Sequence, residues 1–143
     1  MSMRHWSEDG FGFPLFNGKN TEAVYQFISD HDAKVPPMGE FREMIREEKW
    51  PDGLFEDILG ESASWRLAEI INKLEGTTIF KGYSPCGDTD QEEMLGIEPC
   101  FPWTMNSEDL RMTEKRATGY LKKYAGILGV DSEPDYFEAH YFG

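Results

Sequence analysis

Long apolar runs, cysteines and basic residues are all scarce in this sequence of 143 residues. No stretch approaches the roughly 20 consecutive apolar residues that a membrane-spanning helix needs. The first ten residues, MSMRHWSEDG, have no apolar run behind Arg4, so we expect no signal peptide and no membrane partner. The two cysteines, Cys86 and Cys100, are too few for a disulfide framework, and whether they pair is left open. We therefore expect a cytoplasmic location.

Motifs for catalysis and metal binding are also missing. The sequence has no glycine-rich phosphate-binding motif and no nucleophile motif around its serines. His5, His31 and His140 are scattered, and no close pair such as C-x2-C indicates structural zinc. Adjacent carboxylates are expected by chance among 27 acidic residues, so they do not single out an acid–base site. We assign no catalytic residue, no cofactor and no metal ligand.

Negative charge is what the sequence has in excess. The formal net charge is −13, and between Lys81 and Arg111 seven acidic residues occur without a basic one. Basic residues cluster only around 42–49 and 111–123, where they are interleaved with glutamate or threonine. Binding of DNA or RNA needs a basic face, so we expect no direct nucleic-acid partner. A surface this negative attracts basic protein surfaces or cations.

The loop at 86–93 is the best candidate for a cation site, because hard cations bind several carboxylate oxygens. Asp88 and Asp90 begin the spacing of a calcium-binding loop. Glu93 then stands where that loop needs glycine, and Pro99 stands where it needs its last glutamate. A solvated hairpin loop is the simpler interpretation, and cation binding stays an open alternative.

Hydrophobic periodicity and turn residues predict an α+β fold with a mostly antiparallel sheet and helices packed on one face. The predicted order is β-αααα-β-β-α-β. Strands are predicted at 5–16, 77–83, 94–101 and 136–142, and helices at 20–31, 38–49, 52–60, 62–76 and 106–128. The length predicts one acidic domain over 1–143, within which 34–60 is a candidate helical insertion over the sheet.

The predicted core is rich in aromatic residues. Phe11, Phe13 and Leu15 would share one face of the first strand. The last strand has aromatics on both faces, which predicts either a central strand or an interface, and makes a homodimer an alternative. Gly76 and Gly129 are predicted to end two helices. The helical core positions are Val24, Phe27, Ile28, Phe41, Met44, Ile45, Leu54, Phe55, Ile58, Leu59, Trp65, Ala68, Ile71, Leu74, Leu110, Ala117, Leu121, Tyr124 and Leu128.

Our first functional hypothesis is a non-enzymatic interaction protein. Its carboxylates would replace phosphates in the basic groove of a nuclease or another nucleic-acid-binding protein. The size and charge are similar to those of small phage or plasmid inhibitors of restriction and CRISPR nucleases, a likeness of composition only. For Phe101 and Trp103, packing in the core beneath the last helix is the simpler interpretation. The predicted partner-binding residues are Asp88, Asp90, Glu92, Glu93, Phe101, Trp103, Glu108 and Asp109.

Two other hypotheses come from different classes of protein. One is a small enzyme or ligand-binding domain with a carboxylate-rich, metal-assisted pocket. The other is a homo-oligomeric regulatory module that uses the last strand as its interface. A simpler explanation of the charge itself is that it keeps the protein soluble.

Overall fold

A computed structural model describes residues 5–47, 54–84, 92–98 and 114–142 of the chain. Helices and strands follow one another in the predicted order. The predicted start of the last helix, before residue 114, lies outside the described residues. The elements are β1 (His5–Pro14), α1 (Thr21–His31), α2 (Met38–Glu47), α3 (Leu54–Leu59), α4 (Ala63–Glu75), β2 (Phe80–Tyr83), β3 (Met94–Ile97), α5 (Glu114–Leu128) and β4 (Asp135–Phe142).

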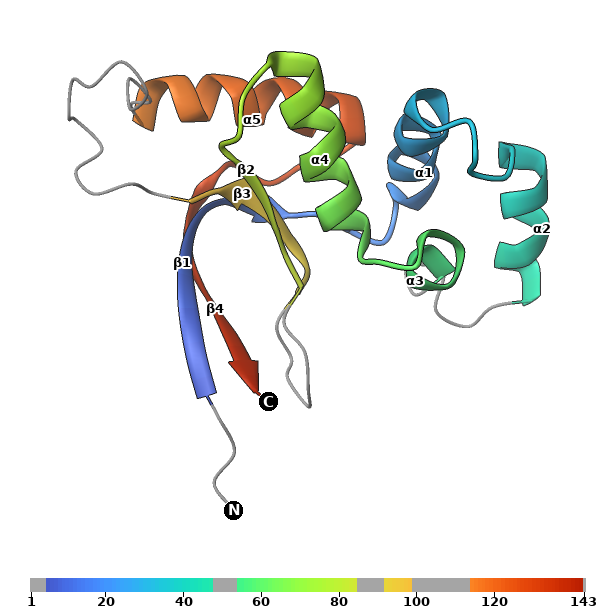
Figure 1. Cartoon of the computed structure of the whole chain (residues 1–143), viewed down its shortest axis with the longest axis horizontal. Helices are drawn as coiled ribbons and strands as arrows, with labels where there is room; N and C mark the ends of the chain where they lie inside the picture. Colours follow the sequence, from blue (N-terminus) through green and yellow to red (C-terminus); the bar gives the residue numbers. More distant parts are fainter. Residues whose placement is uncertain (1–4, 48–53, 85–91, 99–113, 143) are drawn as a thin grey trace.

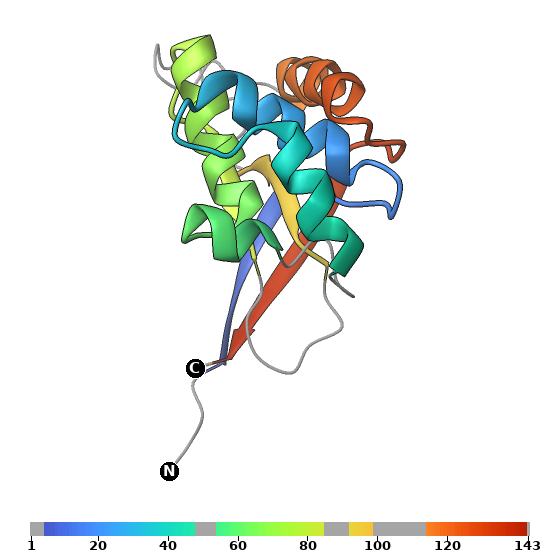
Figure 2. The ribbon, with the colours of Figure 1, turned by 90° about the vertical axis from the view of Figure 1, so that its right-hand side faces the viewer.

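The four strands form one antiparallel sheet in the order β2-β3-β1-β4. The first part of β1, His5–Gly12, pairs with Asp135–Phe142 of β4. Its last part, Phe11–Pro14, pairs with Met94–Ile97 of β3. The helices lie together on one side of the sheet, and the β1–β4 pair extends beyond them (Figures 1 and 2). This is the predicted α+β class, with β4 at an edge of the sheet rather than at its centre.

The hydrophobic core lies between the sheet and the helices. Three alternating residues of β1 and of the position directly after it are buried, as predicted: Phe11, Phe13 and Leu15. The segment 34–60 contributes to the same core, because the ring of Phe41 stacks on Tyr25 with a centroid distance of 3.7 Å. Other buried helical residues are Val24, Phe27, Ile28, Leu54, Phe55, Leu67, Ala68, Ile71, Ala117, Leu121, Tyr124, Ala125 and Leu128.

Three residues that were predicted to be buried are instead exposed. The exposed fractions are 37% for Met44, 57% for Trp65 and 52% for Leu74. On α4 the reason is a close contact with β2: a Cβ atom at Gly82 would lie 2.5 Å from the Ser64 carbonyl carbon. This contact turns the face with Ser64 toward the sheet and leaves Trp65 outside.

The C-terminal ends of two helices are as predicted. Gly76 and Gly129 adopt left-handed backbone angles directly after α4 and α5, with φ of 68° and 69°. Asn20 precedes α1, but its side chain does not cap that helix. Its amide donates instead to the carbonyl oxygens of Leu15 and Leu128, at 2.7 and 3.0 Å. The end of β1 is therefore connected to the end of α5.

Candidate functional site

Of the predicted partner-binding residues, only Glu92 and Glu93 lie in the part of the chain that the structure describes. Glu92 is exposed, and Glu93 is half-buried directly before β3. Whether these residues form one surface with the rest of the predicted site stays a prediction. The positions that lie outside the described residues are Asp88, Asp90, Phe101, Trp103, Glu108 and Asp109, together with Cys86 and Cys100.

Glu93 has a structural contact at the N-terminus of α4. Its Oε1 atom accepts a hydrogen bond of 2.9 Å from the backbone N–H of Ser64, in the first turn of that helix. Its backbone carbonyl accepts another, also of 2.9 Å, from the N–H of Leu15. A carboxylate at this position satisfies an unpaired helical N–H and interacts favourably with the helix dipole. Glu93 therefore helps to fasten α4 to the sheet.

Basic side chains neutralise several carboxylates on the rest of the surface. These pairs connect different elements, as where Arg42 of α2 reaches Glu22 of α1. Exposed pairs of this kind contribute little stability, typically under about 1 kcal/mol each, but they lower the local negative potential. The ion pairs with lysine or arginine are Glu22–Arg42, Asp32–Arg66, Glu61–Arg66, Glu8–Lys81, Glu133–Lys122 and Glu75–Lys123.

The outer side of α2 keeps its negative charge. Glu40, Glu43 and Glu47 are all exposed, and within the part of the chain that the structure describes none forms an ion pair. Their spacing of three and four residues places them along one line on the helix. That line lies opposite Phe41, the buried residue of α2. We call these three glutamates the acidic stripe.

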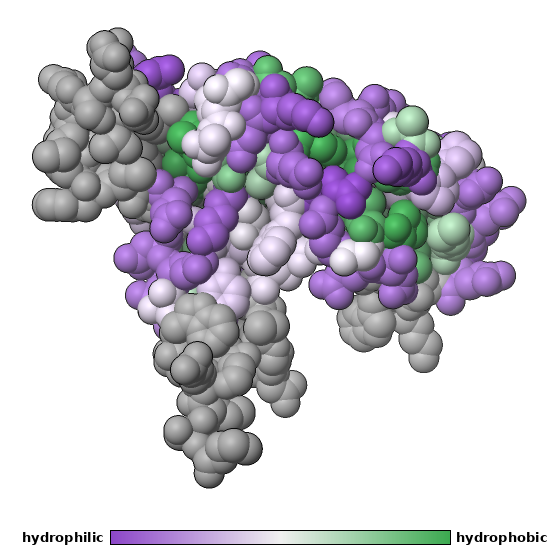
Figure 3. All heavy atoms as spheres, viewed as in Figure 1, coloured by the Kyte–Doolittle hydropathy of each residue, from purple (hydrophilic) through white to green (hydrophobic). Residues whose placement is uncertain are grey.

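The surroundings of the acidic stripe extend its character. Met44 is partly exposed and lies beside the acidic stripe, on the side toward Phe41, so an apolar side chain borders the row of carboxylates. On α3, which packs on α2 through the rings of Phe41 and Phe55, Glu56 and Asp57 are also exposed. Hydrophilic side chains cover the outer side of α2, at the right-hand end of the molecule in Figure 3. Five exposed carboxylates without an ion pair to a described residue therefore lie on α2 and α3, while others, such as Asp30 and Asp131, lie elsewhere on the described surface.

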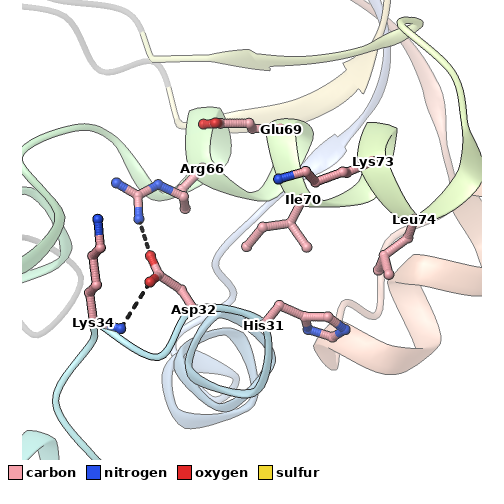
Figure 4. A pocket seen from close by; sticks show the side chains of 8 residues that line it. All are labelled: His31, Asp32, Lys34, Arg66, Glu69, Ile70, Lys73 and Leu74. Carbon is pink, nitrogen blue, oxygen red and sulfur yellow. Dashed lines mark hydrogen bonds and ion pairs between the residues drawn. The ribbon is translucent and has the colours of Figure 1, made fainter.

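A cavity of about 590 Å³ lies between the end of α1 and α4. Figure 4 shows Ile70 at its centre, Lys34 and Asp32 on one side, and Lys73 and Leu74 on the other. His31, Arg66 and Glu69 complete the lining. Lys34, Arg66 and Lys73 therefore share this lining with the carboxylates of Asp32 and Glu69, so both signs of charge are present here.

Arg66 is the cationic residue of this cavity whose guanidinium is held in place by several contacts. It forms ion pairs with Asp32 and Glu61, and it donates a third hydrogen bond, of 3.3 Å, to the carbonyl oxygen of Leu59. The hydrogen bond to Glu61, with the nearby charges of Asp32 and Glu69, raises the pKa of Arg66 above its ordinary value. Arg66 therefore joins the end of α1 to the start of α4 and has few donors left for a ligand.

Other kinds of site find no support in the described part of the chain. No group of three or more His, Cys, Asp or Glu side chains there is arranged to hold a metal ion. Among the same residues, no helix has the length and apolar character that crossing a membrane requires. Comparisons of the chain with protein-family models, curated proteins and solved structures find no match.

Sequence reasoning missed both charged features. The acidic stripe has a readable signal, because Glu40, Glu43 and Glu47 follow helical spacing, but Arg42 and Arg46 made this segment resemble a basic cluster. The cavity has no local signal. Lys34 and Lys73 line one cavity only because α1 packs beside α4.

Proposed function

We propose that this protein is a non-enzymatic interaction protein whose acidic surface binds a basic, nucleic-acid-binding protein. The observation that carries this proposal is the acidic stripe, with its exposed carboxylates that lack basic partners in the described structure. Carboxylates in a row can occupy a groove that otherwise receives phosphates, and they steer the encounter of the two proteins. A nuclease inhibitor of phage or plasmid origin is the kind of protein that would need such a surface.

The energetics of α2 support a role in binding rather than in folding. Like charges three or four residues apart destabilise a helix by about 0.2–0.5 kcal/mol per pair. Glu40 and Glu43, and likewise Glu43 and Glu47, have this spacing. Beyond the first turn of α2, at Glu43 and Glu47, folding alone would therefore favour neutral residues. Met44 adds a flexible apolar contact of the kind that is enriched in protein interfaces.

The test compares a neutralised acidic stripe with an equal change of charge elsewhere. The first variant combines Glu40→Gln, Glu43→Gln and Glu47→Gln. The control combines Asp30→Asn, Glu98→Gln and Asp131→Asn, three exposed carboxylates outside α2. Proteins captured from a lysate at low salt and released at high salt supply the partner, whose Kd is then measured for the wild type and both variants.

We expect the partner to bind nucleic acid and to be displaced from the wild type by DNA. The acidic-stripe variant should bind it at least about tenfold more weakly, because several charge contacts are lost, while the control keeps most of the affinity. The stability of the acidic-stripe variant should stay equal or rise, which separates lost contacts from misfolding. Equal affinity of both variants, or binding that does not depend on salt, would contradict the proposal.

The predicted loop is tested separately. Charge reversal of Asp88, Asp90 and Glu92 should weaken binding and flatten its salt dependence if the loop joins the same surface. Glu93 is left unchanged in this set because of its contact with the start of α4. Unchanged affinity and salt slope would remove the loop from the interface.

A further inference from the structure

β4 lies at one edge of the sheet, and its outer side pairs with no strand among the residues that the structure describes. It runs over eight residues, Asp135–Phe142, and contains neither proline nor lysine. These are residues that usually protect an edge strand from pairing with another chain. β2, at the other edge, has only four residues and includes Lys81. Of the two edges, that of β4 is therefore the one suited to the addition of a further strand.

The shape of the molecule leaves room beside β4. This strand begins next to the helices and ends away from them, because the β1–β4 pair extends beyond the helical layer (Figures 1 and 2). If a second copy paired with β4 in the antiparallel direction, the helices of each copy would lie beside the protruding strand end of the other. The two helical layers would therefore be offset along the strands instead of meeting side by side.

The order of residues in β4 favours one register of pairing with itself. Residues that lie opposite each other in an antiparallel pair share a face of the sheet, so each register of a twofold pair is centred on one residue. Centres at Glu138 and Ala139 give the longest overlaps. A centre at Glu138 places this carboxylate opposite its own copy, which is unfavourable. A centre at Ala139 places Glu138 opposite His140, and Phe137 opposite Tyr141.

We infer that a second copy of this chain pairs with the edge of β4, in the antiparallel register centred on Ala139. The two four-stranded sheets then become one continuous sheet, with the helices of both copies on the same side. A strand of an unrelated protein would lack this match of carboxylate with imidazole and of ring with ring, which is why the occupant is a second copy.

Contacts within one copy prepare both kinds of cross-strand pair. The Nε2 atom of His140 lies 2.9 Å from Oε1 of Glu138 in the same strand. Pairing would therefore bring two imidazoles and two carboxylates together across the twofold axis. On the other face, the ring of Phe137 packs edge-on against Tyr83, with a centroid distance of 4.8 Å. This contact holds the ring in place before the second copy arrives.

Sedimentation velocity over a concentration series at low and moderate salt tests the association of the full-length protein. We expect the dimer fraction to rise with concentration and also with salt, because each copy carries a charge of −13 and salt screens their repulsion. Binding of the proposed partner through the acidic stripe should instead weaken with salt, so the two proposals can fail separately. Hydrogen exchange followed by NMR should show the β4 amides that point away from β1 becoming protected as the concentration rises.

Substitutions across the twofold axis test the register. His140→Glu places two carboxylates opposite each other twice in every dimer, and should raise the Kd of the dimer by about tenfold. Lys115→Gln lowers the net charge by the same amount at an exposed position on α5, and should leave the Kd nearly unchanged. Glu138→Lys alone should also weaken the dimer, because a carboxylate is lost from both pairs.

An equimolar mixture of His140→Glu and Glu138→Lys gives the sharpest test. In a dimer with one copy of each variant, both pairs again join a carboxylate to a basic group, so the mixed dimer should form nearly as tightly as that of the wild type. Mixing does not repair a misfolded chain, so this recovery separates pairing from loss of structure.

Four results would overturn the inference. The wild type could sediment as a monomer at every concentration and salt level, or dimerise without protection of the β4 amides, which would place the interface elsewhere. The third is a dimer that His140→Glu weakens no more than Lys115→Gln does. The fourth is a mixture that associates no more tightly than its two components do alone.

Discussion

At Gly12 the backbones of β1 and β3 approach so closely that no side chain fits. A Cβ atom there would lie 2.1 Å from the carbonyl oxygen of Leu95, and the partner residue in the register is another glycine, Gly96. Because the obstacle is backbone, the strands would have to separate. We expect Gly12→Ala to lower the free energy of unfolding by about 2–4 kcal/mol, measured by urea denaturation.

Gly119 provides the matched control for that change. It lies in the interior of α5 and is exposed, and an added Cβ atom meets nothing within 4 Å. Alanine is the better helix former, so Gly119→Ala should raise the free energy of unfolding by about 1 kcal/mol. If both substitutions had the same effect, close packing between β1 and β3 would not be the reason for Gly12.

At the scale of elements, Glu75 holds α4 and α5 together. Its Oε1 atom accepts hydrogen bonds from Lys123 Nζ, at 2.7 Å, and from the Tyr124 hydroxyl. These hydrogen bonds, the one from Lys123 first, lower the pKa of Glu75 below its ordinary value of 4.5. Because the folded-state pKa is lowered, the contribution to stability is complete above about pH 4.5 and is lost as the pH falls through the folded-state value.

Glu75→Gln should therefore lower the free energy of unfolding by about 1–2 kcal/mol at pH 7, because a charged acceptor is lost. The difference from the wild type should be smaller at pH 3 than at pH 7, because the stabilising charge is lost as the pH falls through the lowered folded-state pKa. Urea denaturation at both pH values measures this. Glu43→Gln removes one negative charge at an exposed position on α2 and is the control for the change of net charge. If the free energies of unfolding of Glu75→Gln and the wild type differed equally at both pH values, the charge of Glu75 would not be the source of the stabilisation.

The elements also show what a sequence can and cannot predict. The buried stripes of α1 and α5 follow from local periodicity, since Val24, Phe27 and Leu121 recur at helical spacing. The orientation of α4 does not, because it depends on Gly82, a residue of the next strand that Ser64 contacts. The cavity is likewise set by tertiary packing. Of these two charged features, only the acidic stripe could have been predicted from the sequence, because Glu40, Glu43 and Glu47 share one helix.

On the scale of the whole molecule, the two charged features divide the surface. The acidic stripe lies on α2, whereas Lys34, Arg66 and Lys73 line the cavity between the end of α1 and α4. The proposed protein partner would therefore bind outside this cavity, since no residue of α2 lines it.

Net charge predicts how the whole fold responds to salt. A formal charge of −13 destabilises the compact state through self-repulsion, and salt screens that repulsion together with the attraction of the ion pairs. Because exposed ion pairs contribute little, we expect repulsion to dominate. Moderate sodium chloride should then raise the Tm by roughly 3–5 °C, which corresponds to about 1 kcal/mol in a chain of this size.

The acidic-stripe variant shows where this response comes from. With Glu40, Glu43 and Glu47 neutralised, less repulsion is left to screen, so its Tm should rise less with salt than that of the wild type. Its Tm at low salt should equal or exceed the wild-type value, since the unfavourable pairs on α2 are gone. Scanning calorimetry across a salt series measures both effects. A Tm that falls with salt would mean that ion pairs such as Asp32–Arg66 outweigh the repulsion, and that the acidic surface is already balanced within the fold.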